Sequence, residues 1–568
     1  MNWLLRYHPR DLPGDLIAGV TVAVMLVPQS MAYAALAGLP PVVGLYASIL
    51  PVMIYGLFGS SRVLTLGPTA ITSVMTLGAI AHLAENDAQM VSLALTLALL
   101  LGVVYLLMGV LRLGVIINLL SDPVLMGYVN AAALIILISQ LPSLFGLSVE
   151  RNPQAAVMLW QTMRGLPALN LATLLLGIIS IALLIGFRGP LDAWLAARGI
   201  RPVLRVAMTR SGALFVTVLM TVIVFAFRLD TNAGVTIIGE IPRGLPELTM
   251  DFSFAQWRSL LFGAVAIAFV GFMEGISTAK SLISRKQQTV RPNQELAAMG
   301  LANISAAFTG GMPVTTSISR SAVNFYAGAN TGLSSIVAGA LMALTTLFLT
   351  PLFFYLPRVA LAAIILTSVI TLFDLRRLRD LWAYSPPEAA ISLLTLVSVF
   401  VVGIEWGILA GVGATVALYV VRSSRMEITE LGRIGYSDFY DDIRREDALP
   451  IDTVLIIRLD ESLYFANSRY MDTSLRNLLA SRRDVRYLVL VCHAVNTVDA
   501  SAVQVILDLV REFSALNIQV YLAGLKGHAF RRLKAAHIRD LLGNERFHET
   551  THAAVQATGK LFDDVLPI

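Results

Sequence analysis

Apolar residues dominate the chain from Leu16 to Val421, in runs long enough to cross a lipid bilayer. Charged residues in this stretch are confined to short gaps. Since a membrane span needs roughly 20 apolar residues, the pattern predicts about fourteen segments separated by Gly, Pro and charged residues. The predicted segments begin near Leu16, Val42, Leu66, Met90, Gly114, Ala168, Val203, Arg258, Pro292, Pro313, Thr331, Pro357, Pro386 and Glu405.

The gaps alternate in charge. Every second gap carries arginine or lysine, whereas the intervening gaps are acidic, mixed or nearly neutral. Short cytoplasmic loops of membrane proteins carry an excess of Lys and Arg, so we expect the basic gaps, and with them both chain ends, on the cytoplasmic side. The basic gaps include Arg10, Arg62, Arg112, the group Arg188, Arg198, Arg201, Arg205 and Arg210, then Arg285, Arg377 and Arg422.

Two of the segments are interrupted in the same way. The third contains Gly67 and Pro68 before a hydroxyl-rich helical start, and the tenth contains Gly310, Gly311 and Pro313 before another. They lie seven segments apart, and because seven is odd, a second copy of the repeat would cross the membrane upside down. Two helices that are merely kinked at proline are the alternative interpretation.

Inverted repeats with broken helices are typical of secondary transporters, whose binding site lies near the middle of the membrane. A helix that begins there presents unpaired backbone N–H groups and the positive end of its dipole. Two such starts facing each other form a site for an anion, and irregular backbone is tolerated at that depth only where it lines a cavity.

Two charged residues lie inside predicted segments. Glu274 lies in the eighth, with Ser277 and Thr278 on the same helix face, and an intramembrane carboxylate is a candidate functional group. Arg320 follows Ser317 by three residues in the tenth. Arg320 can contact the substrate, pair with Glu274, or only stabilise the fold, and these alternatives stay open.

In the first segment, Gln29 and Tyr33 lie four residues apart on one helix face. Both side chains can donate hydrogen bonds to an anion without adding charge. Cross-linking of neighbouring helices is the alternative role for such residues.

Composition separates the chain of 568 residues into two parts. Overall, 56% of the residues are hydrophobic and 14% are charged, with a net charge of +5, whereas after Arg422 the composition becomes that of a soluble protein. The modest positive charge fits loop asymmetry, and we predict no nucleic-acid partner. The single cysteine, Cys492, lies in a predicted buried strand, so neither a disulfide nor a thiolate metal cluster can form within the chain, and we predict no metal site or cofactor.

The tail alternates short apolar strands with amphipathic helices, which predicts a small α/β domain. It has no phosphate-binding loop, zinc motif or nucleophile elbow, so an enzyme is not predicted. Asp499, Ala500 and Ser501 lie at a strand-to-helix turn, where capping of the helix is the expected role. We expect strands at 453–459, 486–491 and 519–523, and helices at 468–480, 501–516 and 528–537.

Several motifs together are specific to one family. They are PQSMAYAALAGLPPVVGLYAS (Pro28 to Ser48), LGPTA (Leu66 to Ala70), MEGISTAK (Met273 to Lys280), SISRSAVNFYAGANTGLSS (Ser317 to Ser335) and VNTVDASAVQVI (Val495 to Ile506). From about Gly14 to Lys560 the chain resembles the SulP anion transporters, the sulfate-permease family, with a C-terminal STAS domain.

The resemblance implies an α-helical membrane protein with about fourteen transmembrane segments in a seven-plus-seven inverted repeat, divided into core and gate domains. It also implies a small cytoplasmic α/β STAS domain and a homodimer. We therefore expect a cytoplasmic lead at 1–14, a transporter domain at 15–421, a linker at 422–450 and the STAS domain at 451–568.

The resemblance also implies site residues. Contacts with the anion would come from Gln29, Tyr33, Thr69, Ala70, Ser317 and Arg320. Glu274, with Thr278 one turn later, matches the acidic coupling position, where proton-coupled relatives have glutamate and sodium-coupled bicarbonate relatives often have aspartate. Ser501 aligns with the phosphorylatable serine of anti-sigma-factor antagonists, although Ala500 and Ala502 depart from that motif.

These expectations combine into one hypothesis. The chain is a secondary active transporter of small anions in the inner (plasma) membrane, a proton-coupled symporter of sulfate or a dicarboxylate that works by alternating access. Sodium-coupled bicarbonate symport, anion exchange and an anion channel are the alternatives. The expected partners are the anion, the lipid bilayer, a second copy of the chain and a cytoplasmic protein that binds the STAS domain.

Overall fold

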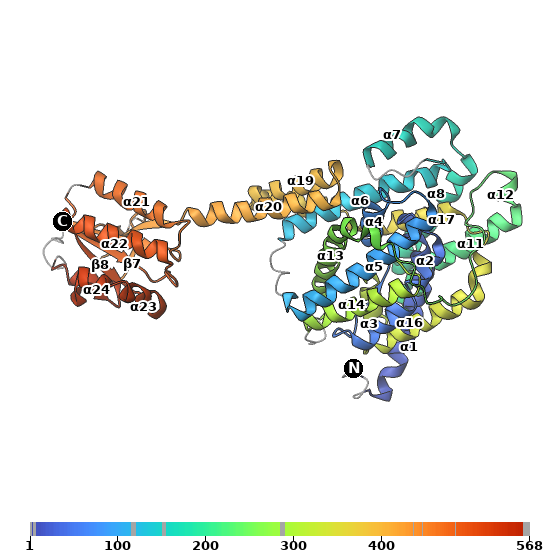
Figure 1. Cartoon of the computed structure of the whole chain (residues 1–568), viewed down its shortest axis with the longest axis horizontal. Coiled ribbons are helices and arrows are strands. Elements are labelled where there is room, and N and C mark those ends of the chain that lie inside the picture. The colour runs from blue at the N-terminus through green and yellow to red at the C-terminus, as the bar shows by residue number, and fades with distance from the viewer. Residues whose placement is uncertain are drawn as a thin grey trace. The chain divides into compact units, whose positions relative to one another are not determined.

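The computed structural model of the chain describes residues 3, 7–114, 121–149, 155–200, 202–283, 290–435, 437–445, 447–482 and 484–559. Parts of the predicted lead and STAS domain, together with Arg201 and Arg285, lie outside the described residues. The chain divides into two compact units, Met1–Thr415 and Val416–Ile568. The first unit is helical, and the second combines helices with a mixed sheet (Figure 1).

Within the described residues, ten helical stretches are long and apolar enough to cross a membrane. Four further predicted segments correspond to helices that are shorter or less apolar, namely α4, α14, α15 and α19. Each predicted segment therefore has a helical counterpart, which confirms a multi-pass α-helical membrane protein, while the seven-plus-seven repeat stays a prediction. The principal helices are α1 (Leu12–Leu36), α2 (Pro41–Tyr46), α3 (Leu50–Phe58), α4 (Ala70–Ile80), α5 (Asp87–Val110), α6 (Asp122–Phe145), α7 (Ala155–Gly165), α8 (Leu171–Arg188), α9 (Pro190–Ala197), α10 (Pro202–Arg210), α11 (Gly212–Phe227), α13 (Trp257–Ile283), α14 (Pro292–Phe308), α15 (Ile318–Tyr326), α16 (Leu333–Leu344), α17 (Arg358–Val369), α18 (Leu375–Tyr384), α19 (Pro386–Val401) and α20 (Ile404–Ser424).

The two interrupted segments meet. Strand β1 (Leu66–Gly67) pairs antiparallel with β2 (Thr315–Thr316), so that Leu66 lies opposite Thr316. Helix α4 begins three residues after β1, and α15 begins two residues after β2. Because the paired strands run in opposite directions, the helices that follow them leave the ladder in opposite directions. The prediction that these stretches come together is confirmed.

Small residues bring α13 close to this ladder. A methyl group added at Gly271 would lie 2.4 Å from the Thr315 side chain, and one added at Gly275 would lie 2.7 Å from the Thr316 hydroxyl. Glycines four residues apart let helices approach other backbones closely in membranes. The close contact places Glu274, which lies between these glycines, beside the two half-helices. Helix α5 packs against both α13 and α14 (Figure 1).

Two other buried carboxylates act as structural anchors. Asp15 in α1 accepts hydrogen bonds from the backbone N–H groups of Asn330 (2.7 Å) and Thr331 (2.9 Å) and from the Thr331 hydroxyl (2.5 Å). Glu295 in α14 accepts from Tyr55 Oη at 2.7 Å and from backbone and hydroxyl groups of Ser60 and Ser61 at 2.6–2.9 Å. Both carboxylates thus have several donors, as buried charges require.

The second unit is a small α/β domain whose sheet has the strand order β4-β3-β6-β7-β8-β9, with β5 paired to β3. Alternate residues of the central strand β6 enter two different cores, Leu455 and Ile457 one core and Val454 and Ile456 the other, so both sheet faces are covered. The elements are β3 (Ile428–Ile434), β4 (Tyr440–Asp442), β5 (Ala448–Leu449), β6 (Val454–Leu459), α21 (Ser468–Ser481), β7 (Tyr487–Val491), α22 (Ala500–Ala515), β8 (Gln519–Ala523), α23 (Gly527–Ala535), α24 (Ile538–Leu542), β9 (Phe547–His548) and α25 (Thr551–Gln556).

The predicted linker at 422–450 needs correction. This stretch contains β3, β4 and β5, and β3 pairs with the central strand β6. The stretch has the sequence pattern of a charged connector because its strands are short or mix polar with apolar residues. The fold of the second unit therefore begins near Ile428, before the expected boundary.

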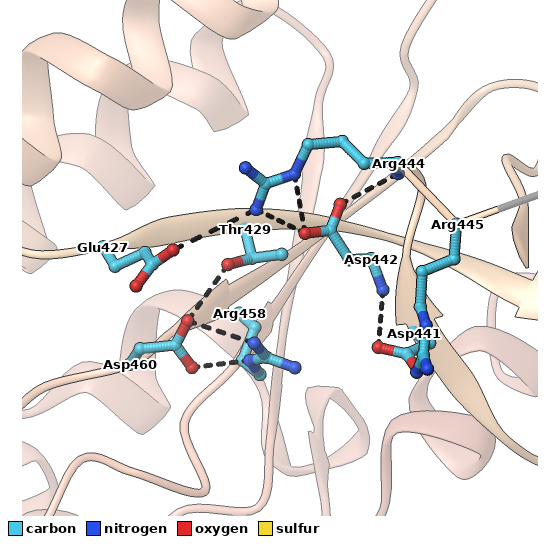
Figure 2. A network of polar contacts seen from close by, with 8 residues as sticks. All are labelled: Glu427, Thr429, Asp441, Asp442, Arg444, Arg445, Arg458 and Asp460. Atoms are coloured by element: carbon cyan, nitrogen blue, oxygen red, sulfur yellow. Dashed lines mark hydrogen bonds and ion pairs between the residues drawn. The ribbon is translucent and has the colours of Figure 1, made fainter.

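A network of charges links β3, β4 and β6 (Figure 2). The Arg444 side chain donates to Asp442 Oδ2 at 2.7 Å, and the Arg445 side chain pairs with Asp441. Asp460 accepts from the Arg458 Nε at 2.5 Å and from the Thr429 hydroxyl at 3.0 Å. Arg444 also pairs with Glu427, just before β3, at 4.0 Å, so the contacts reach from the edge strand to β3 and from β3 to β6. Charges along an edge also discourage pairing with other chains.

Candidate anion-binding site

A cavity of about 920 Å³ opens beside the meeting point of the two half-helices. It is lined by residues of both helix starts and by residues of α1, α6, α8, α10, α13 and α17. Of the predicted site residues, those that line it are Gln29, Tyr33, Thr69, Ala70, Glu274 and Ser317. The structure therefore brings together side chains from four segments that are far apart in the sequence.

The start of α4 is capped by Thr69. Its backbone is extended, and its hydroxyl accepts a hydrogen bond from the Thr72 backbone N–H at 3.2 Å. Ala70 is the first residue of the helix and lines the cavity. The first N–H groups of a helix have no partner within the helix, so this end presents donors and positive dipole to the cavity.

The start of α15 repeats the arrangement. Ser317 is the capping residue, and its hydroxyl accepts from the Arg320 backbone N–H at 3.4 Å. The Arg320 side chain is 1% exposed, and its Nε and Nη2 atoms have no hydrogen-bond partner among the described residues. The guanidinium lies against β1, because a methyl group added at Gly67 would be 3.1 Å from Nη2. Arg320 thus lies behind the cavity wall and adds positive charge there.

Three threonine hydroxyls connect the two starts. The Thr72 and Thr315 oxygens are 2.6 Å apart, Thr69 and Thr315 are 3.3 Å apart, and Thr69 donates to Thr72 at 3.0 Å. The hydroxyls hold the N-terminal end of α4 against β2. Hydroxyl groups both donate and accept, so the hydroxyl of Thr69, the one of the three that lines the cavity, can reorient toward an anion there.

Glu274 differs from the two anchoring carboxylates. It is half-buried, it lines the cavity, and its buried Oε2 atom has no hydrogen-bond partner among the described residues. Although its charge and that of Arg320 lie near enough to interact, no ion pair within 4.0 Å joins these two described side chains. An ion pair that holds two helices together is thus not what the structure records.

The remaining predicted groups surround this centre. Gln29 and Tyr33 of α1 line the cavity, and the Gln29 Oε1 atom has no hydrogen-bond partner among the described residues. The Thr278 hydroxyl donates to the backbone carbonyl of Glu274 at 2.6 Å, and Thr278 is not among the described residues that line the cavity. Thr278 therefore supports the helix beneath Glu274.

Comparison with known proteins identifies the chain. Residues 12–395 match the Sulfate permease family, and residues 447–554 match the STAS domain. The chain belongs to the sulfate permease family. Family membership confirms that this permease is a membrane transporter of anions, as predicted, and not an enzyme.

Several relatives cover nearly the whole permease. A probable sulfate transporter of Mycobacterium tuberculosis is 35% identical over 97% of this chain and 96% of that protein. The chloroplastic sulfate transporter 4.1 of Arabidopsis thaliana is 33% identical over 95% of this chain and 79% of that protein.

Solved structures share the fold of the permease. The murine Solute Carrier 26 family member A9 anion transporter, in an inward-facing state, superposes with a TM-score of 0.88 at 23% identity, over 98% of this chain and 93% of that chain. The transmembrane domain of the cyanobacterial bicarbonate transporter BicA gives 0.59 at 22% identity, over 72% and 98%.

Sequence reasoning missed part of the site. Thr72 and Thr315 were not singled out, nor were Arg188, Arg210 and Ser368, which also line the cavity. The threonines carried a usable signal, since Thr72 is three residues after a predicted cap and Thr315 directly precedes the other start. The arginines carried none, because in the sequence they are indistinguishable from loop charges that set orientation.

In the STAS domain, Ser501 is exposed in the first turn of α22. The cap is Asp499, which accepts from the Ala502 backbone N–H at 2.8 Å, so Ser501 is not needed for capping. Phosphorylation of Ser501 stays a prediction. Cys492 is 3% exposed at the end of β7, and burial raises the pKa of its thiol to about 12, which agrees with its predicted place in the core.

Proposed function

We propose that this permease is a secondary active transporter that carries a small oxyanion, sulfate or a dicarboxylate, together with a proton by alternating access. Relatives along the whole chain are named sulfate transporters. The observation that carries the proposal is Glu274, a carboxylate that lines the cavity beside two helix starts and whose buried Oε2 atom has no hydrogen-bond partner among the described residues.

Anion binding would use the helix starts. The N-terminal N–H groups of α4 and α15 supply donors, and the hydroxyls of Thr69 and Ser317 add orientable ones. Arg320 supplies a full positive charge from behind the wall. Such a site is positive without an exposed cation, so it binds a dehydrated anion and still releases it.

Coupling would depend on the protonation of Glu274. When it is ionised, its negative charge offsets Arg320 and opposes the approach of an anion. When a proton neutralises it, the positive potential of Arg320 and the helix ends is available to the substrate. Bound proton and bound anion therefore favour each other, which is the thermodynamic requirement for symport.

Orientation and assembly are also proposals. The cavity is lined near its mouth by Arg188, Arg205, Arg210 and Arg377, which belong to the basic gaps. By the positive-inside rule the cavity opens to the cytoplasm, with both chain ends on that side of the plasma membrane. A homodimer and a cytoplasmic partner for the STAS domain, regulated through Ser501, remain part of this proposal.

The test is uptake of labelled sulfate and succinate into liposomes that contain the purified permease. We expect an inward proton gradient to increase uptake severalfold and a sodium gradient to leave it unchanged. The Glu274→Gln variant should lose the response to the proton gradient and keep the wild-type thermal midpoint, because Glu274 makes no anchoring contacts.

Three results would contradict the proposal. Uptake driven by sodium alone would identify the other coupling ion, and a flux that does not saturate with substrate would identify a channel. A Glu274→Gln variant that retains wild-type dependence on the proton gradient would remove Glu274 from the coupling mechanism.

A further inference from the structure

Four arginines line the cavity near its mouth, and the structure treats them differently. Arg205 pairs with Asp192 at 3.0 Å, and Arg377 pairs with Asp122 at 3.5 Å. Arg188 and Arg210 form no ion pair with a carboxylate among the described residues. Two of the four positive charges are therefore neutralised within the protein, and two are not.

The two unpaired arginines line a pocket at the side of the cavity. The pocket measures about 30 Å³ and is bounded by α1, α8, α10, α11 and α17. About 10–15 Å³ of such space holds one water molecule, so the pocket alone holds about two, and the adjoining cavity supplies the further space that an oxyanion needs. Its polar lining consists of Gln29, Arg188, Thr209, Arg210, Thr367 and Ser368.

The position of Arg188 is fixed by neutral groups. Its Nη1 donates to the Thr367 carbonyl at 2.5 Å, and its Nη2 lies 3.3 Å from the Ser368 hydroxyl. These acceptors orient the guanidinium but cancel none of its charge. Arg188 is exposed, and it lines the same pocket as Arg210, near enough for the two positive charges to repel each other. Two like charges held beside one partly buried pocket are unfavourable unless an anion lies between them.

We propose that this side pocket is a second anion site, in which Arg188 and Arg210 bind a small oxyanion such as sulfate. The pocket adjoins the main cavity and shares Gln29, Arg188, Thr209, Arg210 and Ser368 with it. Its described lining includes neither Thr69 nor Ser317, the caps of the half-helix starts, so an anion bound there occupies a different position from one at the helix starts. Paired donors of a guanidinium suit the oxygens of an oxyanion.

The second site deepens the proposed function, on which it rests. Gln29 lines both the pocket and the main cavity, so its amide can contact an anion in either place. An anion that enters from the basic mouth would first bind Arg188 and Arg210 and then move past Gln29 to the helix starts. The side pocket thus raises the local concentration of substrate at the transport site.

The number of sulfate ions bound by the purified full-length permease tests this proposal. We expect equilibrium binding of radiolabelled sulfate to give two equivalents in the wild type. Arg210→Gln should remove one of these two equivalents. It should also raise the KM for uptake about tenfold, because one charge-assisted contact with the anion is lost. Arg210 is exposed, so its substitution leaves the packing intact, and Arg210→Lys should restore the second equivalent.

The matched control is Arg205→Gln, a change on the same helix that removes a charge already paired with Asp192, and it should keep two equivalents. One equivalent in the wild type, or two in Arg210→Gln, would overturn the proposal. If two equivalents bind but uptake does not respond to the proton gradient, proton coupling is rejected and the second anion site is kept. If the permease binds no sulfate, both the proposed transport of sulfate and the second anion site are rejected.

Discussion

At the scale of single residues, Gly67 satisfies two independent requirements of the site. Its φ angle is +150°, a conformation that residues with side chains rarely adopt. A side chain there would also meet the Arg320 guanidinium at 3.1 Å and the Leu26 side chain at 3.5 Å. The residue therefore allows both the turn out of β1 and the close approach of the buried arginine.

We predict that Gly67→Ala strongly reduces anion uptake. The strained backbone costs about 1–3 kcal/mol, and the added methyl group displaces Arg320 from the cavity wall. The measurement is initial uptake rate in liposomes at matched protein content. Gly78→Ala is the matched control, because it lies in the same segment with no atom within 4 Å of the added methyl group, and should retain normal uptake.

Part of the site could be predicted from local sequence signals. Thr69 and Ser317 stand where a capping residue precedes a helix, and Glu274 is conspicuous as a charge within an apolar segment. The hydroxyl contacts of Thr315 could not be predicted, because they depend on how β2 approaches α4. Whether Arg320 pairs with Glu274 was also undecidable, since spacing along two different helices does not fix a distance between them.

At the scale of elements, polar side chains fix the two half-helices to their surroundings. The Asn303 side chain of α14 donates to the Val314 carbonyl and accepts from the Val314 backbone N–H, both at 2.9 Å, just before β2. Asn324 of α15 donates to the Val63 carbonyl at 3.0 Å, and the Ser321 hydroxyl accepts from the Thr65 backbone at 3.0 Å. These bonds satisfy backbone groups that irregular segments leave unpaired in a membrane.

The contrast between the buried carboxylates gives a second prediction. Glu295→Gln should lower the thermal midpoint clearly, because a glutamine cannot accept the full set of bonds from Tyr55, Ser60 and Ser61 and turns a donor toward donors, at a cost of about 1.5–3 kcal/mol. Thermal unfolding followed by intrinsic tryptophan fluorescence measures the shift. Equal midpoints for Glu295→Gln and Glu274→Gln would contradict this division between anchor and functional carboxylate.

At the scale of the whole molecule, the STAS domain has its own cores and its own charge network. Hydrogen bonds from the side chain and then the backbone of Arg444 hold the pKa of Asp442 below its ordinary value, and similar bonds lower the pKa of Asp441. A carboxyl group with a lowered pKa in the folded state stabilises the fold at pH values above its ordinary pKa. The stabilisation is lost as the pH falls through the lowered value.

We therefore predict that a fragment starting at Met426 folds alone and that acid destabilises it between about pH 5 and pH 2. Circular dichroism melts at pH 7 and pH 3 measure the change in thermal midpoint. Asp442→Asn should lower the midpoint at pH 7 and reduce the drop on acidification. Asp452→Asn, at an exposed turn, serves as the control, and an identical pH response in both variants would contradict the role of the network.

The domain fold was predictable only where its pattern is strong. The central strands, such as β8, and the longer helices, such as α21, lie within about two residues of their predicted positions. Short apolar runs indicate these strands, and amphipathic spacing indicates these helices. Strands β3 to β5 were not predicted. Strand β3 mixes polar with apolar residues, and β4 and β5 are only three and two residues long, so their pairing in the sheet alone reveals them as strands.

The short ladder between β1 and β2 limits how the binding site can move. The two half-helix starts at the candidate site are joined backbone to backbone through β1 and β2, and Asn303, Asn324 and Ser321 hold the segments around them. Release of a bound anion by separation of the two half-helices would break this backbone pairing. If the protein exposes the site to each side of the bilayer in turn, the two half-helices and the bound anion must therefore move together as one rigid body. The surface past which this rigid body moves then lies along α6, α8 and α17, which also contribute residues to the cavity lining.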